Sequence, residues 1–136
     1  MITSDKQYKA AEAQLAMLTQ SFSSPIKKGT PDIVAKAGKT QLQELIAEIQ
    51  RDLEEYDVLK SSKPSDIEIH SLSDLMVVPI RYRIASHMSI EAFSRKVGVS
   101  ARQIARYETE NYQNTNSSTL QKILGVLNIH LDGKVA

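Results

Sequence analysis

Cysteine is absent from the 136 residues of the chain, and this absence narrows the chemistry open to it. Without a thiol there is no disulfide framework, no thiolate metal site and no cysteine nucleophile, and the composition fits a reducing cytoplasm. No apolar run approaches the ~20 residues that span a bilayer, and the first residues, MITSDKQYK, lack the apolar core of a signal peptide. We therefore expect a cytoplasmic protein with no membrane partner.

Glycine and histidine are also too scarce and too scattered to build a catalytic site. The five glycines lie far apart, so the chain has no glycine-rich phosphate loop. The histidines His70, His87 and His130 form no pair at metal-ligand spacing. The carboxylates of residues 54–57 belong to an exposed helical face rather than a pocket, which gives a paired acid–base role little support. We predict no catalytic residues, no metal and no cofactor.

The hydrophobic content of 41% is sufficient for one small core or for two compact pieces. Residues 60–66, KSSKPSD, read as a polar linker, and helical periodicity dominates on both sides of it. We expect an all-α protein with two domains. Residues 1–63 would form a helical hairpin for dimerisation or partner binding, and residues 64–136 a helix-turn-helix DNA-binding domain.

Two apolar stripes mark the helices of the predicted hairpin. Residues 4–22 begin with a capping box, Ser4 with Gln7, and residues 41–60 repeat apolar side chains every three or four positions. Two helices about 30 Å long could pack antiparallel, and we expect residues 23–40 to connect them through a short helix that starts at Thr30 and Pro31. Each stripe either only closes the hairpin or also forms a dimer or holds another protein. The predicted face consists of Tyr8, Leu15, Leu18, Leu42, Ile46, Ile49, Leu53 and Tyr56.

Between the two parts, residues 67–70 alternate as a short extended segment would. Ser71 can cap a brief helical turn, and Pro79 suits the first turn of the next helix. Further along the chain, Ser117 or Ser118 can cap a helix that Asn128 ends.

Residues 88–108, MSIEAFSRKVGVSARQIARYE, carry the start and stop signals of two short helices joined by a tight turn. Ser89 caps the first helix, Gly98 can turn the chain at positive φ, and Ser100 caps the second helix. Apolar side chains then recur at the spacing that lets two crossing helices share a small core. These core positions are Ala92, Phe93, Val97, Val99, Ile104 and Tyr107.

Positive charge is concentrated around this motif. Residues 81–106 contain six arginines and lysines and one acidic residue, Glu91. About five positive charges are therefore concentrated there, in a chain whose net charge is +1. On the second helix, small residues allow close approach to DNA, and Arg and Gln can form paired hydrogen bonds with guanine and adenine edges. The predicted base-reading residues are Ala101, Arg102, Gln103, Ala105 and Arg106. The predicted phosphate contacts are Arg81, Arg83, Ser89, Arg95, Lys96 and Ser100.

Two alternatives weigh against this interpretation. An Arg-Gln face on a short helix is often only a solvated surface. Arg106 could also pair with Glu91 or Glu108 and stabilise the motif rather than read a base.

Arg81 to Leu131 resembles the XRE, or lambda-repressor-like, DNA-binding domain. The matching segments follow the family order: 81–88 RYRIASHM for the first helix, 89–94 SIEAFS for the second, 97–100 VGVS for the turn, 103–108 QIARYE for the recognition helix, and 112–127 YQNTNSSTLQKILGVL for the capped fourth helix. The resemblance implies a five-helix fold that binds double-stranded operator DNA. The sequence departs from the family at Ile90, where many members carry a Gln that touches a phosphate.

The layout of the whole chain is similar to that of bacterial XRE regulators grouped with HigA-type antitoxins. The similar segments are the N-terminal helix from MITSDKQY, the long helix ending in LEEY at Tyr56, and SLSDL at 71–75. The resemblance implies a homodimer that represses its own operon from a palindromic operator and restrains a cognate toxin. The alternative hypothesis is a protein-interaction module, an adaptor or toxin-neutralising protein with little DNA binding of its own.

Overall fold

The computed structural model describes residues 1–136 and is entirely helical, which confirms the expected all-α class. The chain divides into two compact units, Met1–Val58 and Leu59–Ala136. The elements follow one another as α1 (Asp5–Ser23), α2 (Asp32–Ser61), the 3-10 helix η1 (Pro64–Asp66), α3 (Leu72–Ala85), α4 (Ile90–Val97), α5 (Ala101–Thr109) and α6 (Ser117–Val126).

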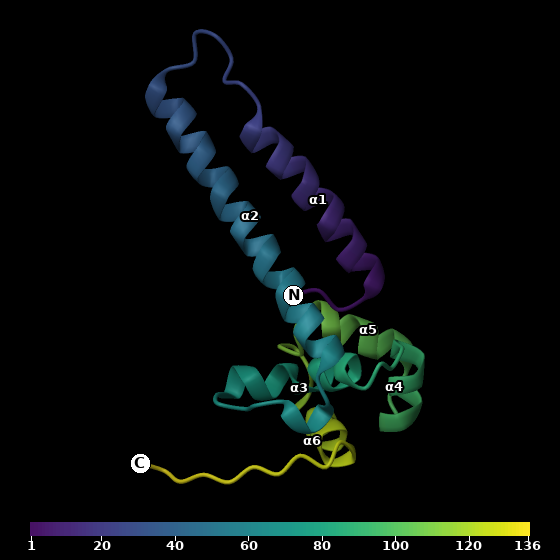
Figure 1. Ribbon diagram of the computed structural model, residues 1–136. Coiled ribbons are helices and arrows are strands. Elements are labelled where there is room, and N and C mark those ends of the chain that lie inside the picture. Colours follow the sequence, from purple (N-terminus) through teal and green to yellow (C-terminus); the bar gives the residue numbers. More distant parts are fainter. The chain divides into compact units, whose positions relative to one another are not determined.

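The first unit is a hairpin in which α1 and α2 run side by side in opposite directions (Figure 1). We call the end that holds Tyr8 and Tyr56 the base, and the loop between the helices the tip. At the base the two tyrosine rings lie 5.5 Å apart. The Tyr8 hydroxyl donates to Asp57 at 2.9 Å, and the Tyr56 hydroxyl donates to Asp5 at 2.7 Å. Two reciprocal hydrogen bonds therefore fix how α1 and α2 meet at this end.

Both helices of the hairpin begin where the sequence indicates a start. The Ser4 hydroxyl accepts from the backbone N–H of Gln7 at 3.2 Å, which satisfies one of the free donors of the first turn of α1. Pro31 directly precedes α2 and already has the φ angle of a helix.

α2 is longer than the sequence analysis predicted. The short helix expected after Pro31 and the helix expected from residue 41 are one continuous helix of 30 residues. Gly38 lies inside it, and a side chain at that position would meet nothing within 4 Å. A glycine in a helix interior costs about 1 kcal/mol. That cost is too small to end a helix that continues for six turns beyond it.

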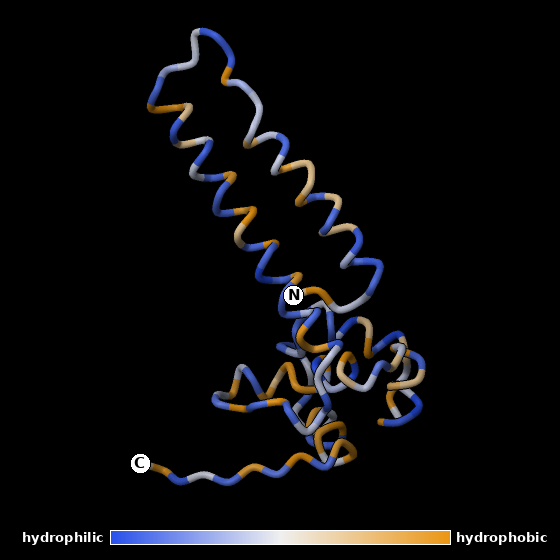
Figure 2. The backbone as a smooth tube through the Cα atoms, viewed as in Figure 1, coloured by the Kyte–Doolittle hydropathy of each residue, from blue (hydrophilic) through white to orange (hydrophobic).

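The seam between α1 and α2 leaves its apolar side chains only partly covered. None of the residues of α1 is buried. Of the predicted face, Leu53 and Tyr56 near the base are buried, whereas the other members are half-buried. Figure 2 shows hydrophobic residues recurring along both helices between hydrophilic ones, which is the pattern of one stripe per helix. One partner helix covers each stripe incompletely.

The second unit has a core of fully buried side chains. Ile80, Phe93, Ile104, Tyr112 and Ile123 are each 0% exposed, and they come from α3, α4, α5, the loop after α5 and α6. Four of the six predicted core positions are buried: Phe93, Val97, Ile104 and Tyr107. Ala92 and Val99 are half-buried at its edge.

The structure corrects two helix starts in this unit. Ser71 accepts from the N–H of Asp74 at 3.1 Å and begins a 14-residue helix, α3, that continues through Pro79. Pro79 is therefore inside a helix, not at its first turn, and its ring is buried among the apolar residues of the core. The cap of α6 is Asn116 rather than a serine, and its side chain accepts from the N–H of Ser118 at 2.8 Å. α6 ends at Val126 with Leu127 as its C-cap, and Asn128, predicted to end the helix, follows in the left-handed region at φ 61°.

Candidate nucleic-acid interface

The helix-turn-helix of α4 and α5 is built from two serine caps and one glycine. Ser89 accepts from the N–H of Ala92 at 3.1 Å, and Ser100 accepts from the N–H of Gln103 at 3.3 Å. Between them Gly98 adopts φ 72°, in the left-handed region, and its N–H donates to the Ser94 carbonyl at 2.9 Å. These local interactions stop α4 and restart the chain as α5 within three residues.

α5 separates into a buried and an exposed face. Ile104, Tyr107 and Glu108 are buried, and they follow one another at the spacing of one helical face. Of the predicted base-reading residues, Ala101 at the first turn is half-buried and the other four are exposed. The structure therefore groups Arg102, Gln103, Ala105 and Arg106 on the free side of the helix, within two turns.

A buried ion pair attaches α5 to α3. Arg83 is 6% exposed and donates through Nε and Nη2 to both carboxylate oxygens of Glu108, at 2.6 and 2.8 Å. Its Nη1 also donates to the backbone carbonyl of Met88 at 3.1 Å, in the connection between α3 and α4. A forked pair of this kind fixes orientation as well as distance. One side chain thus holds three successive segments in position.

This burial corrects one predicted phosphate contact. Arg83 is one of the predicted phosphate contacts, yet its guanidinium lies in the interior and is hydrogen-bonded to Glu108. We therefore no longer expect Arg83 to contact DNA. The pair also weighs against Glu108 as the partner of Arg106, because Arg83 already donates to both oxygens of Glu108. Arg106 is exposed, with its guanidinium carbon 5.5 Å from the centre of the Tyr107 ring.

The other predicted phosphate contacts lie at the surface of this unit. Ser89 and Ser100 are exposed at the N-termini of α4 and α5, where helix dipoles and free N–H groups favour an anion. Arg95 and Lys96 are exposed in the last turn of α4, and the Lys96 ammonium lies 5.9 Å from the Tyr82 ring centre. Arg81 on α3 is half-buried.

Two contacts that hold the helix-turn-helix in position were not predicted from the sequence. Lys122 on α6 donates from Nζ to the Gly98 carbonyl at 3.2 Å and so fastens the turn from outside. Nothing in the sequence indicates this contact, which joins residues 24 positions apart. Glu108 did carry a signal, because it follows Ile104 by four residues on the face that periodicity buries. A carboxylate on that face requires an internal partner.

The loop after α5 is shaped by a buried tyrosine. Asn111 and Tyr112 both have positive φ, 52° and 58°, and the Tyr112 ring lies 5.6 Å from that of Tyr107. Burial, the main cause, and the nearby charge of Glu108 raise the pKa of the Tyr112 hydroxyl far above its usual range. The backbone N–H of Tyr112 also donates to the Tyr107 carbonyl at 2.7 Å and so anchors the loop to the end of α5.

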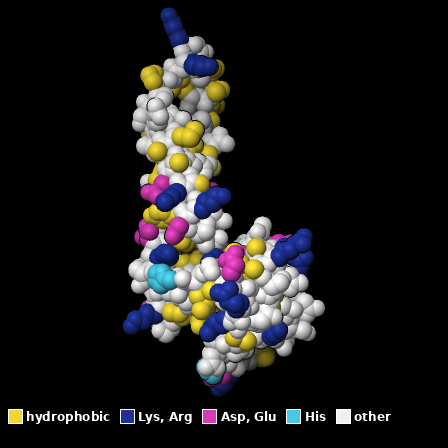
Figure 3. Space-filling view, turned by 90° about the vertical axis from the view of Figure 1, so that its right-hand side faces the viewer, with side chains coloured by type: hydrophobic (Ala, Val, Ile, Leu, Met, Phe, Trp, Pro, Cys, Tyr) yellow, Lys and Arg dark blue, Asp and Glu magenta, His cyan; other side chains and the backbone are white.

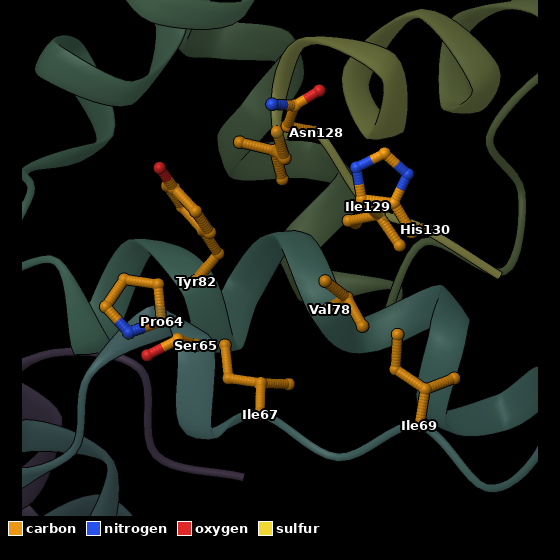
Figure 4. Close-up of a pocket in the computed structure, with 10 residues that line it drawn as sticks. Pro64, Ser65, Ile67, Ile69, Val78, Tyr82, Asn128, Ile129 and His130 are labelled. Atoms are coloured by element: carbon orange, nitrogen blue, oxygen red, sulfur yellow. The ribbon is translucent and has the colours of Figure 1, made fainter.

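A shallow pocket of about 310 Å³ lies on another part of this unit (Figure 4). Ile67 and Ile69 come from the extended segment before α3, Val78 and Tyr82 from α3, and Ile129 from the segment after α6. Its walls are mainly apolar and hold these two irregular segments against α3. No group of three or more metal-ligating side chains is placed to hold a metal ion, and none of the helices is long and apolar enough to span a membrane.

Comparison with known families agrees with this geometry. Residues 80–134 match a family model described as helix-turn-helix, and the match includes α4, α5 and α6 in full. The matched segment therefore contains both capped helices, the glycine turn and the exposed face of α5. No curated protein and no solved structure matches the chain.

Proposed function

We propose that the protein is a sequence-specific DNA-binding transcriptional regulator that acts in the cytoplasm and inserts α5 into the major groove. The observation that carries this proposal is the exposed face of α5, on which Arg102, Gln103 and Arg106 project from a helix fixed by the Arg83–Glu108 pair. Arg can form two hydrogen bonds with guanine O6 and N7, and Gln can do the same with adenine N6 and N7. Ala101 and Ala105 allow the helix backbone to approach the bases.

Phosphate contacts around this helix would set its orientation. The N–H groups at the start of α4 and α5, beside the exposed Ser89 and Ser100, can donate to phosphate oxygens. Arg95 and Lys96 at the other end of α4, together with Arg81, extend the positive charge. Ile90 is half-buried at the first position of α4, so any phosphate contact there would come from Ser89 and backbone N–H groups.

The regulator would bind a palindromic operator as a dimer. Two recognition helices related by two-fold symmetry reach successive major grooves about 34 Å apart, and the symmetry of the operator mirrors that of the dimer. The resemblance of the chain to HigA-type antitoxins supports a narrower role, in which the dimer represses its own operon and a cognate toxin binds to it.

The test is a titration of the full chain into labelled DNA from immediately upstream of its coding region, at two salt concentrations. The wild type should bind this fragment well above scrambled DNA. Its affinity should fall steeply with salt, in proportion to the phosphates neutralised. The Arg102→Ala, Arg106→Ala variant should lose the preference for the fragment. Loss of two base contacts, at about 1–3 kcal/mol each, corresponds to roughly a 30-fold or larger decrease in affinity.

The matched control removes the same charge from the hairpin. Lys6→Ala, Lys9→Ala lies in the other unit, on exposed positions of α1, and should retain binding within a few fold. Far-UV circular dichroism confirms that each variant is folded. Equal binding of the operator and scrambled DNA by the wild type at low salt would refute the proposal for this DNA.

A second candidate function is a protein-interaction module, and the hairpin favours it. α1 has no buried residue, and the exposed fractions of Met17, Ile33 and Val34 are 70%, 80% and 56%. A partner such as a cognate toxin would bind through these apolar side chains, and its affinity would depend weakly on salt. Co-purification with the product of the neighbouring reading frame at both salt concentrations, without specific DNA binding, would favour this candidate.

A further inference from the structure

Charge is segregated along the length of the hairpin. Residues 27–39, at the tip and in the first part of α2, contain four lysines and one aspartate, a net charge of +3. Residues 44–57, toward the base, contain six carboxylates and one arginine, a net charge of −5. On the face shown in Figure 3, lysine side chains mark the tip, and acidic side chains appear only at the lower part of the hairpin, where basic side chains also lie among them.

One flank of α2 repeats this segregation in a symmetric order. Lys36, Thr40, Gln43, Ala47, Gln50 and Glu54 follow one another at spacings of four, three, four, three and four residues. The last four directly follow the seam residues Leu42, Ile46, Ile49 and Leu53, so they lie beside the seam along one side of the hairpin. Five of the six are exposed, and Ala47 is half-buried.

The midpoint of this stripe is residue 45, and the two ends have opposite charges. Lys36 and Glu54 lie nine residues on either side of it, about 13 Å along the helix. Between them the stripe carries no charge, and the corresponding flank of α1 contributes the uncharged Ala16 and Thr19 near the middle and the oppositely charged Glu12 and Lys9 toward the base. Rotation by 180° about this midpoint exchanges a positive end with a negative end, so the flank is complementary to itself.

We propose that the hairpin binds a second copy of itself along this flank in antiparallel orientation, with the tip of each copy against the base of the other. In such an isologous interface Lys36 of each copy faces Glu54 of the other, and Gln43 of each faces Ala47 of the other. The half-buried seam residues beside the stripe lose further solvent contact, and this burial is the main driving term.

The charge order selects both the partner and the orientation. A parallel pair would place lysines against lysines at the tip and carboxylates against carboxylates toward the base, which is repulsive. A stripe whose charges are complementary about its own centre fits a second copy of itself, and this symmetry would not be required for an unrelated partner. The interface builds on the dimer in the proposed function, but its experiment contains no DNA. Failure of this interface and failure of operator binding are therefore distinguishable.

The first experiment measures the dimer dissociation constant of the full chain by analytical ultracentrifugation. Lys36→Glu turns two attractive contacts per dimer into repulsive ones and should raise the dissociation constant at least ~10-fold at low salt. Adding Glu54→Lys to the same chain reverses both ends and should restore the wild-type value. The control Lys6→Glu makes the same charge change on the side of α1 away from the seam and should have little effect.

The second experiment uses the absence of native cysteine to report orientation. Gln43→Cys, near the two-fold axis, should cross-link to its own copy with a short bis-maleimide. Ile33→Cys should not, because the two copies of residue 33 would be about 36 Å apart along the helices. A monomeric wild type, an unchanged dissociation constant for Lys36→Glu, or efficient cross-linking through residue 33 would each overturn the proposal.

Discussion

The two units of this protein use apolar residues in opposite ways. The helix-turn-helix unit fully buries side chains from every helix between α3 and α6, and it ties them together with an internal ion pair. The hairpin unit has an almost entirely half-buried seam, and it is closed at its base by two tyrosine hydroxyls. The helix-turn-helix unit is therefore stable through its own packing, whereas the hairpin unit keeps apolar surface that is only partly covered.

The difference follows from the number of helices in each unit. A helix stripe about 100° wide is covered only when several neighbours contact it. Four short helices can surround Phe93, but two long helices touch along one line. The greater length of α2 does not increase the burial of each seam residue, because a longer helix adds residues along the seam but no further helix to cover them.

The largest effect should come from removing a core side chain. Phe93→Ala leaves a cavity in the helix-turn-helix unit and should lower its free energy of unfolding by about 3–5 kcal/mol. Leu15→Ala, at a half-buried seam position, should cost the hairpin only about 1–2 kcal/mol. Urea unfolding followed by circular dichroism measures both. Equal losses would contradict the distinction between the two units.

Breaking the internal ion pair tests whether packing or charge stabilises the helix-turn-helix unit. Arg83→Met leaves Glu108 buried without a partner and should cost about 3–5 kcal/mol. The double variant Arg83→Met, Glu108→Leu replaces both charges by apolar side chains of similar size and should regain most of that loss. If the double variant is as unstable as the single one, then the pair itself provides the stability.

Two glycines should respond to alanine with opposite signs. Gly98→Ala forces a side chain into a left-handed turn and places its Cβ 3.3 Å from Lys122 Nζ, so it should destabilise by about 1–2 kcal/mol. Gly38→Ala, at an open position in the first part of α2, should stabilise the hairpin by about 0.5–1 kcal/mol. Thermal unfolding of both variants measures the pair. The same sign for both would contradict the assigned backbone conformations.

The smallest expected effect is the pH dependence that His70, at the surface of the helix-turn-helix unit, adds to the stability of that unit. A hydrogen bond to Glu68 at 2.8 Å, with its negative charge, raises the pKa of His70 above its ordinary value of 6.5. A raised pKa means that the stabilisation is fully present below pH 6.5 and is lost as pH rises through the folded-state value. An NMR titration should return the His70 pKa toward 6.5 in Glu68→Gln, whereas Glu44→Gln in the hairpin should leave it unchanged.

Local signals predicted most of the helix-turn-helix. Ser89, Gly98 and Ser100 cap helix ends through contacts with residues three or four positions away. The bounds of α4 and the start of α5 could therefore be predicted from them. The exposed face of α5 followed from the same periodicity. The interior position of Arg83 could not be read this way, since it depends on Glu108, 25 residues later in the chain.

Where local signals competed with longer-range ones, the predictions failed. The connector was expected to reach residue 40 and a helix to begin near Pro79, yet α2 continues through Gly38 and α3 through Pro79. A single unfavourable residue costs a few kcal/mol at most, and a long helix or a packed ring can offset this.

The sequence by itself determined the helical class, the capped turn between α4 and α5, and the apolar stripes of the hairpin, because each depends on neighbours within about one helical turn. Only the tertiary structure decided that Arg83 is internal, that Lys122 holds the Gly98 carbonyl, and that the hairpin seam remains half covered. These features arise from contacts between segments far apart in the chain, and periodicity does not specify which side chains will meet.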